Sequence, residues 1–184
     1  MLRKALEHNR KFVAEEGYKQ FITTKYPNEK VAIITCMDTR LVELLPAAIG
    51  FKNGDVKIIK NAGGVISHPF GSVIRSLIIA IYELGVESVW VIGHTDCGME
   101  RLDVNSVLDK MKSRGISPDI IDVVKCCGVD YEAWLGGFDS ANESVISTME
   151  QIHEHPLIPK DIRIEGLIID SMTGELTLIK SIIP

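Results

Sequence analysis

The sequence lacks a hydrophobic run of the eighteen or so residues that a membrane-spanning helix needs, and its best candidate, SLIIAIYELG, is much shorter. It also lacks a basic surplus, since 20 lysines and arginines stand against 25 acidic residues for a net charge of −5. These absences argue against a membrane protein and against a nucleic-acid-binding protein. No repeat, linker or low-complexity segment is present, so residues 1–184 are expected to form a single domain.

Cysteine is also scarce, with only Cys36, Cys97, Cys126 and Cys127 in the chain. A domain of this length can bury a core without disulfide bonds. The first residues, MLRKALEHNRKF, have the pattern of an amphipathic helix rather than that of a signal peptide. We therefore expect a cytoplasmic protein with reduced thiols. The adjacent pair Cys126–Cys127 lacks the C-x-x-C spacing of a dithiol switch, and we expect two partly buried or loop thiols.

The sequence does contain a regular alternation of β-branched runs and helical patterns. Strands are predicted at residues 30–36, 55–61, 86–94 and 162–170, and a last strand follows a turn at 172–174. Helices are predicted at residues 2–16, 40–50, 69–85, 117–125 and 139–155. This order predicts an α/β fold with a central, mainly parallel β-sheet, flanking helices and a C-terminal antiparallel edge hairpin.

Three side chains of different chemistry lie close together in the segment ITCMDTR. In extended backbone, Cys36, Asp38 and Arg40 would point to the same side, because successive side chains alternate between faces. Cys36 ends the first predicted strand, and His94 ends the third. Ligands of open α/β sheets bind beyond the carboxyl ends of the strands, so these residues are expected at one functional rim.

The segment GHTDCG adds a metal-binding pattern to this rim. His94 and Cys97 are three residues apart, which allows an imidazole and a thiolate to reach one ion. With Cys36 they form a Cys₂His set, which favours zinc and leaves a fourth position open, as catalytic zinc sites do. We expect Asp38 to accept a hydrogen bond from the zinc-bound water, and Arg40 to keep this carboxylate ionised and away from the metal.

The pattern Cys-x-Asp-x-Arg followed by His-x-x-Cys-Gly resembles the signature of the β-class carbonic anhydrases. The segments IITCMDTRL, IIKNAGG, IRSLIIAIYELG, GHTDCGMERLD, PLIPKDIRIEGLIID and TGEL are similar, in the same order, to those of the small archaeal-type branch of that family. The resemblance extends from about Lys30 to Leu178. It implies reversible hydration of carbon dioxide to bicarbonate and a proton, by attack of zinc-bound hydroxide.

The resemblance also implies roles for individual residues. One Zn²⁺ per subunit would be held by Cys36, His94 and Cys97, and Asp38 and Arg40 would form the catalytic dyad beside it. The loop that lines the carbon dioxide pocket would consist of Asn61, Ala62, Gly63 and Gly64. At Gly64 the sequence departs from close relatives, which often carry a polar residue there.

Family resemblance further implies a homodimer or a higher homo-oligomer. Residues 1–28 would then be a helical arm that packs on a partner subunit. Two other functions use the same residues: hydrolysis of carbonyl sulfide or carbon disulfide, which are linear molecules like carbon dioxide, and zinc binding without catalysis.

Several residues outside these motifs have less specific interpretations. Asp96 is expected to cap the turn after His94 or to bond a backbone N–H. His68 is expected to be a surface cap near a helix start, with proton shuttling as the alternative. The stretch Lys125–Asp139 fits the family pattern poorly, and a lid, an interface patch and an ordinary loop all remain open for it.

Overall fold

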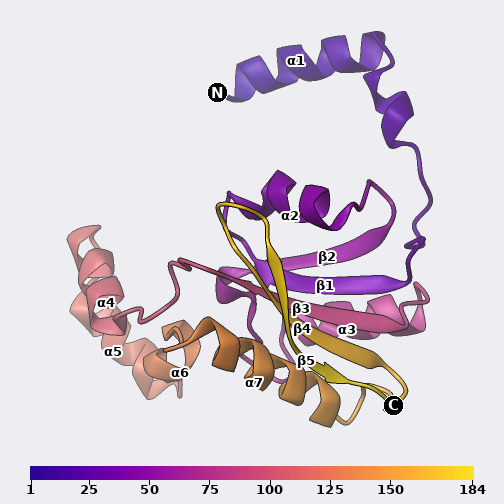
Figure 1. Ribbon diagram of the computed structural model, residues 1–184. Helices are drawn as coiled ribbons and strands as arrows, with labels where there is room; N and C mark the ends of the chain where they lie inside the picture. Colours follow the sequence, from indigo (N-terminus) through magenta and orange to yellow (C-terminus); the bar gives the residue numbers. More distant parts are fainter.

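The computed structural model describes residues 1–184 and is built around a five-stranded β-sheet (Figure 1). The strands are β1 (Val31–Cys36), β2 (Val56–Asn61), β3 (Ser88–His94), β4 (Arg163–Ile169) and β5 (Leu176–Ile182), in the spatial order β2-β1-β3-β4-β5. The first four strands are parallel, and β5 pairs antiparallel with β4 at the edge. This architecture confirms the predicted α/β fold and its terminal hairpin.

Seven α-helices and two short 3₁₀ segments connect the strands. They are α1 (Leu2–Ala14), α2 (Leu41–Ile49), α3 (Ser72–Tyr82), α4 (Val104–Ser113), α5 (Pro118–Cys126), α6 (Tyr131–Leu135), α7 (Ala141–Glu154), η1 (Gly17–Phe21) and η2 (Ala62–Gly64). Helix α3 is shorter than the predicted helix at 69–85, because the backbone N–H groups of Phe70 and Gly71 bond back to His68 and form a turn before it. Helices α4 and α6 are absent from the prediction.

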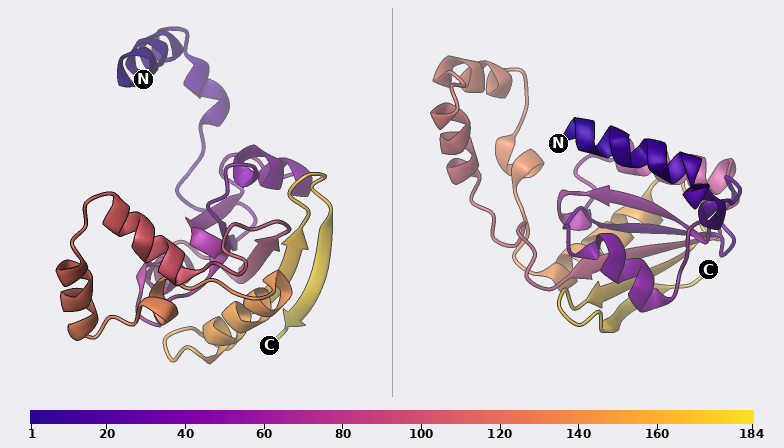
Figure 2. Two further views of the ribbon diagram at one scale, coloured as in Figure 1. Left: turned by 90° about the vertical axis from the view of Figure 1, so that its left-hand side faces the viewer. Right: turned by 90° about the horizontal axis from the view of Figure 1, so that it is seen from above.

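Helices cover both faces of the sheet (Figure 2). On one face, Ala32 and Ile34 of β1 join a hydrophobic cluster with residues of α3 and α7. On the other face, Ile33 packs with Leu41 and Leu45 of α2. Strand β1 is therefore buried along its whole length, as is typical of parallel sheets covered on both sides. This packing fixes the carboxyl ends of β1 and β3, where the candidate site lies.

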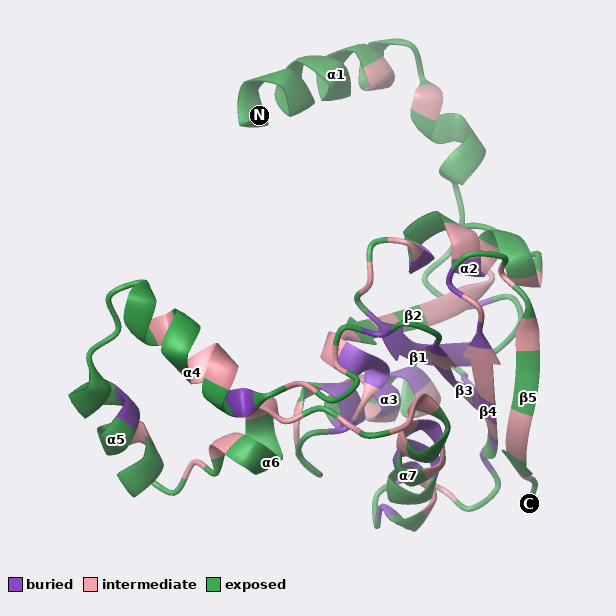
Figure 3. Ribbon diagram, turned by 60° about the vertical axis from the view of Figure 1, so that its left-hand side comes forward, coloured by how far each residue is buried: buried purple, intermediate pink, exposed green.

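Two parts of the chain project from this body. Helix α1 has no buried residue, and η1 and an extended segment separate it from the sheet (Figures 1 and 2). Helices α4, α5 and α6 form a second projection, which we name the helical lobe (residues 104–135; Figure 3). Only Val104 and Ile121 of the lobe are buried. None of the helices has the length and apolarity needed to cross a membrane.

Candidate metal centre

The sheet brings the three expected metal ligands together. Cys36 is the last residue of β1, His94 is the last residue of the adjacent β3, and Cys97 lies in the turn that follows. All three are buried, and one ligand atom from each lies within 4.8 Å of the other two. The hydroxyl of Thr35 donates to the carbonyl of Ile92 at 2.8 Å, which ties the ends of these two strands together.

The spacing of these atoms fits a zinc ion. The two sulfur atoms lie 3.9 Å apart. Two thiolates bound at 2.3 Å around a tetrahedral ion would be separated by about 3.8 Å, so the pair is already spaced for shared coordination. Both cysteines are free thiols, and no fourth Cys, His, Asp or Glu belongs to the cluster. Three protein ligands of this kind are the donor set of a catalytic rather than a structural zinc site.

His94 is oriented to offer one particular nitrogen. Its Nδ1 lies 2.8 Å from the carbonyl oxygen of Thr95, which can only accept, so Nδ1 carries the proton. Nε2 is buried, and no hydrogen bond of good geometry satisfies it. A buried nitrogen lone pair without a partner is costly unless a ligand occupies the space in front of it. A hydrogen bond of this kind from Nδ1–H to a backbone carbonyl commonly fixes the tautomer and orientation of a metal-binding imidazole.

The two thiols respond differently to their surroundings. Burial raises the pKa of Cys36, but His94 and the backbone N–H groups of Gly63 and Asp38 lower it by more, to about 7. Burial also raises the pKa of Cys97, and the nearby Cys36 raises it further, to about 11. Two thiolates this close repel each other unless a cation lies between them. A bound dication removes this conflict and allows both sulfurs to ionise.

Asp38 and Arg40 form a tight pair beside the ligands. Oδ1 of Asp38 accepts from the backbone N–H of Arg40 at 2.8 Å and from its Nε at 3.1 Å, while Oδ2 accepts from the guanidinium at 2.8 Å. The side-chain hydrogen bonds from Arg40 lower the pKa of Asp38 to about 2. The predicted contact between the two side chains is therefore present.

The expected reason for this contact, extended backbone from Cys36 to Arg40, is wrong. Strand β1 ends at Cys36, and Arg40 has helical backbone angles at the start of α2. The N–H of Leu41 bonds to the carbonyl of Asp38 at 3.2 Å, so a turn rather than strand alternation folds Arg40 back over the carboxylate.

Asp96 also belongs to this group of side chains, although the sequence predicted another role for it. Its carboxylate does not cap the turn. Instead it accepts from the second guanidinium nitrogen of Arg40 at 2.7 Å, and its carbonyl accepts from the same guanidinium at 2.8 Å. Asp96 has a φ of 54°, which turns this carbonyl toward Arg40. The one signal for this turn in the sequence is that aspartate adopts positive φ more often than most non-glycine residues.

The turn of η2 lies against the metal ligands. Asn61 braces the turn through two hydrogen bonds to the backbone of Val65, at 2.6 and 3.1 Å. Gly64 has a φ of 67°, and a β carbon there would lie 3.0 Å from the backbone nitrogen of Cys36. Such a contact is tighter than ordinary van der Waals packing, so the lack of a side chain at Gly64 lets the turn lie directly on β1.

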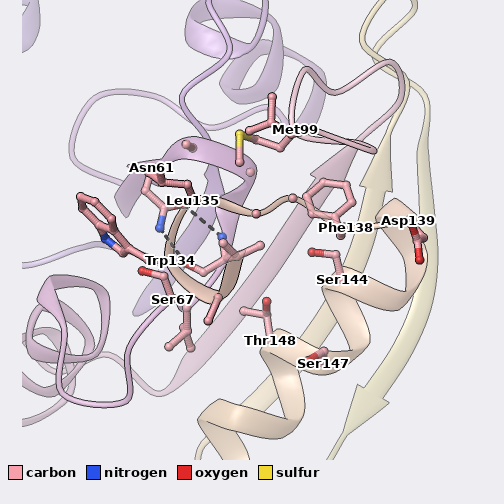
Figure 4. Close-up of a pocket in the computed structure, with 18 of the residues that line it drawn as sticks. Asn61, Ser67, Met99, Trp134, Leu135, Phe138, Asp139, Ser144, Ser147 and Thr148 are labelled. Atoms are coloured by element: carbon pink, nitrogen blue, oxygen red, sulfur yellow. Dashed lines mark hydrogen bonds between the residues drawn. The ribbon is translucent and has the colours of Figure 1, made fainter. Parts of the chain in front are cut away.

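A cavity of about 630 Å³ lies on the outer side of this turn (Figure 4). Asn61, Ala62 and Gly63 line it, together with Met99, Phe138 and residues of α7, whereas Gly64 does not. Of the four residues expected to line the carbon dioxide pocket, three therefore border this cavity, and Gly64 packs against Cys36 instead.

The remaining residues singled out from the sequence lie elsewhere. Residues 125–139 are the end of α5, the short helix α6 and the return to α7. Cys126 and Cys127 are exposed free thiols at the end of α5. Nδ1 of His68 accepts from the N–H of Phe70 at 3.0 Å, within the turn before α3 rather than as a cap of the helix itself.

Comparison with known proteins supports this geometry. The family model described as carbonic anhydrase matches residues 31–176. The Bacillus subtilis protein "Putative carbonic anhydrase YvdA" is 49% identical over 178 residues, which cover 97% of this chain and 90% of that protein. The crystal structure of β-carbonic anhydrase isoform I from Trichomonas vaginalis superposes with a TM-score of 0.90 at 35% identity, covering 99% of this chain and 98% of that one.

A relative with another activity also matches. A carbon disulfide hydrolase from Acidianus is 30% identical over 161 residues, covering 81% of this chain and 76% of that protein. The match to the carbonic anhydrase family extends from the first strand to the beginning of the last one. With the clustered Cys₂His ligands and the five-stranded sheet, these similarities show that the chain belongs to the β-carbonic anhydrase family.

Proposed function

We propose that this protein catalyses the reversible hydration of carbon dioxide to bicarbonate and a proton, with one zinc ion per subunit held by Cys36, His94 and Cys97. The observation that carries the proposal is the buried cluster of these three ligand atoms within 4.8 Å, next to the Asp38–Arg40 pair. Family membership and the free Nε2 of His94 support it. A bound zinc ion supplies Lewis acidity, which makes water nucleophilic near neutral pH.

Asp38 orients the attacking water in this proposal. A carboxylate has about four lone-pair positions, and Arg40 occupies three of them. One position remains to accept a hydrogen bond from water. With a pKa of about 2, Asp38 stays ionised at neutral pH and cannot retain a proton. It therefore positions the water, and the released proton passes to solvent or buffer rather than to Asp38.

Stopped-flow hydration of carbon dioxide by metal-quantified protein, measured across pH, tests this function. We expect a rate that is proportional to the zinc content and is lost when a chelator removes the metal. A fully zinc-loaded, folded protein without any rate above that of buffer would instead support a non-catalytic zinc-binding homologue.

Hydrolysis of carbon disulfide or carbonyl sulfide is the second candidate. The relative from Acidianus at 30% identity favours it, since its activity is reached from a similar sequence. Release of hydrogen sulfide, measured beside carbon dioxide hydration on the same preparation, separates the two. We expect carbon dioxide to be turned over faster, and a higher rate with carbon disulfide would reverse the assignment.

A homodimer in the cytoplasm completes the proposal, with residues 1–28 of each subunit packed on its partner. The support is the exposed apolar side of α1, where Leu2, Leu6 and Val13 are 73%, 51% and 53% exposed without a cover in the monomer. Light scattering of the full chain and of a variant with Leu2, Leu6 and Val13 changed to serine tests this arrangement. We expect a dimer for the former and a weaker or absent dimer for the latter. An unchanged dimer would exclude the arm as the main contact.

A further inference from the structure

The helical lobe is attached to the chain directly beside the metal ligands. Its outgoing and returning ends are held together by backbone hydrogen bonds, from Arg101 N–H to the carbonyl of Phe138 at 2.8 Å and from Phe138 N–H to that of Met99 at 3.3 Å. Glu100 and Phe138 also form an isolated β-bridge. Met99 is only two residues beyond Cys97. The return of the lobe is thus joined to the loop that carries a metal ligand.

A glycine makes this close approach possible. A β carbon on Gly137 would lie 1.7 Å from the carbonyl oxygen of Met99, far inside van der Waals contact. Only glycine can occupy this position without displacing the loop. The backbone at Gly137 therefore lies in close contact with the backbone of Met99. This contact fixes the position of the next residue, Phe138.

The ring of Phe138 lies next to the turn that packs against Cys36. Cε1 of Phe138 would lie 3.2 Å from a β carbon on Gly63, and the side chain of Met99 lies beside it (Figure 4). The next residue of this turn, Gly64, lies directly against Cys36, since a β carbon on Gly64 would be 3.0 Å from the backbone nitrogen of Cys36. Phe138 and Met99 also pack against the hydrophobic cluster that contains Cys36 and Cys97.

The ring of Phe138 also borders the cavity. Phe138 and Gly63 both line the cavity of about 630 Å³, so removal of the ring would open the outer side of the turn to that space. Gly63 has a φ of 81° and no side chain of its own with which to hold the turn in place. The ring of Phe138 provides the side-chain packing that Gly63 itself cannot provide.

We infer that Phe138 is a positioning residue for the metal centre. Its ring holds the Ala62–Gly64 turn against the end of β1, and so fixes the position of the ligand Cys36. Residues that hold a metal ligand in position without touching the metal affect metal retention, and their mutation typically costs tenfold or more in affinity. This inference rests on the proposed zinc site, but it assigns a role to a residue outside the ligands and the dyad.

Zinc release from the full-length protein into excess of a chromogenic chelator tests the inference. We expect Phe138→Ala to release zinc about tenfold faster than the wild type, and Phe138→Leu, which keeps most of the bulk, to stay within about twofold. Trp134→Ala is the matched control: it removes a larger ring from the same cavity, and Figure 4 shows this ring pointing away from Phe138. Its release rate should equal that of the wild type.

The cobalt-substituted proteins supply a readout that loss of stability alone would not change. The sulfur-to-cobalt charge-transfer band should shift in Phe138→Ala and stay unchanged in Phe138→Leu and Trp134→Ala. Wild-type zinc release and an unshifted band in folded Phe138→Ala would overturn the inference. Should Phe138→Ala not fold, Phe138→Val must release zinc faster than Phe138→Leu, and equal rates would likewise overturn it. Failure of the proposed function is separate, because it would appear in the wild type as absent zinc or absent hydration.

Discussion

Arg40 binds both carboxylate oxygens of Asp38 and so leaves this acid with little freedom to rotate or to take up a proton. Its own backbone N–H adds a third contact to Oδ1. The pair is partly shielded, with side-chain exposures of 33% for Arg40 and 17% for Asp38. The proposed division of roles, in which one residue orients water and the other restrains it, follows from this geometry.

Replacement of Asp38 should separate zinc binding from turnover. We expect Asp38→Ala to retain about one equivalent of zinc, because the carboxylate is not among the clustered ligand atoms. Its kcat should fall about 100-fold, within the range of a lost acid–base or orienting group. Metal analysis and stopped-flow hydration on the same sample provide the check. Undiminished turnover in Asp38→Ala would refute the assigned role.

The depressed pKa of Asp38 predicts where its contribution to stability depends on pH. Its pKa of about 2 in the folded protein lies below the ordinary value of 3.8, so the ionised pair stabilises the fold above about pH 4. This stabilisation is lost as the pH falls toward 2 and the carboxylate is protonated. Thermal melts of wild type and Asp38→Asn should therefore differ at pH 5 and converge near pH 2. A difference that grows on acidification would contradict the prediction.

Replacement of Asp96 should lower kcat much less than replacement of Arg40, although the two side chains form an ion pair. Asp96 is exposed, with 85% of its side chain accessible, and exposed pairs contribute little. We expect Asp96→Asn to change kcat by less than about twofold, and Arg40→Gln to lower it by about tenfold or more, because it releases Asp38. Steady-state kinetics at constant zinc content distinguishes these outcomes. Equal losses in both variants would place Asp96 in the catalytic group.

Gly64 offers a test of the close contact between the η2 turn and β1. Gly64→Ala should lower the free energy of unfolding by about 2–3 kcal/mol, since it adds a clash with Cys36 to the cost of its positive φ. Gly50→Ala is the control, because its φ of 74° is similar but nothing lies within 4 Å of the new methyl group. Gly50→Ala should lower the free energy of unfolding by about 1 kcal/mol, which is the cost of placing a non-glycine residue at positive φ. Urea unfolding measures both, and equal losses would mean that the contact is unimportant.

Much of this arrangement could be predicted from the sequence because it depends on local patterns. β-Branched runs indicated the strands, and the positions of Cys36 and His94 at strand ends predicted that parallel pairing would bring them together. The clustering of Cys97 with them followed from its position only three residues after His94.

Other features depend on contacts that the sequence does not display. Helix α4 is different, because its apolar residues Val104, Val107, Leu108 and Met111 have helical spacing, so the sequence did contain the signal for it. The pairing of Arg40 with Asp96 arises from a residue at φ 54°, and that of Phe138 with Gly63 joins segments 75 positions apart. Both rest on tertiary geometry rather than on spacing.

The zinc content and hydration rate of Cys36→Ser, compared with those of Cys127→Ser, test the central claim most directly. Cys36 lies in the buried ligand cluster, whereas Cys127 is an exposed free thiol outside it. The account predicts that Cys127→Ser holds about one equivalent of zinc and hydrates carbon dioxide at the wild-type rate, while Cys36→Ser loses both together. A Cys36→Ser protein that keeps a full equivalent of zinc and the wild-type rate would contradict it.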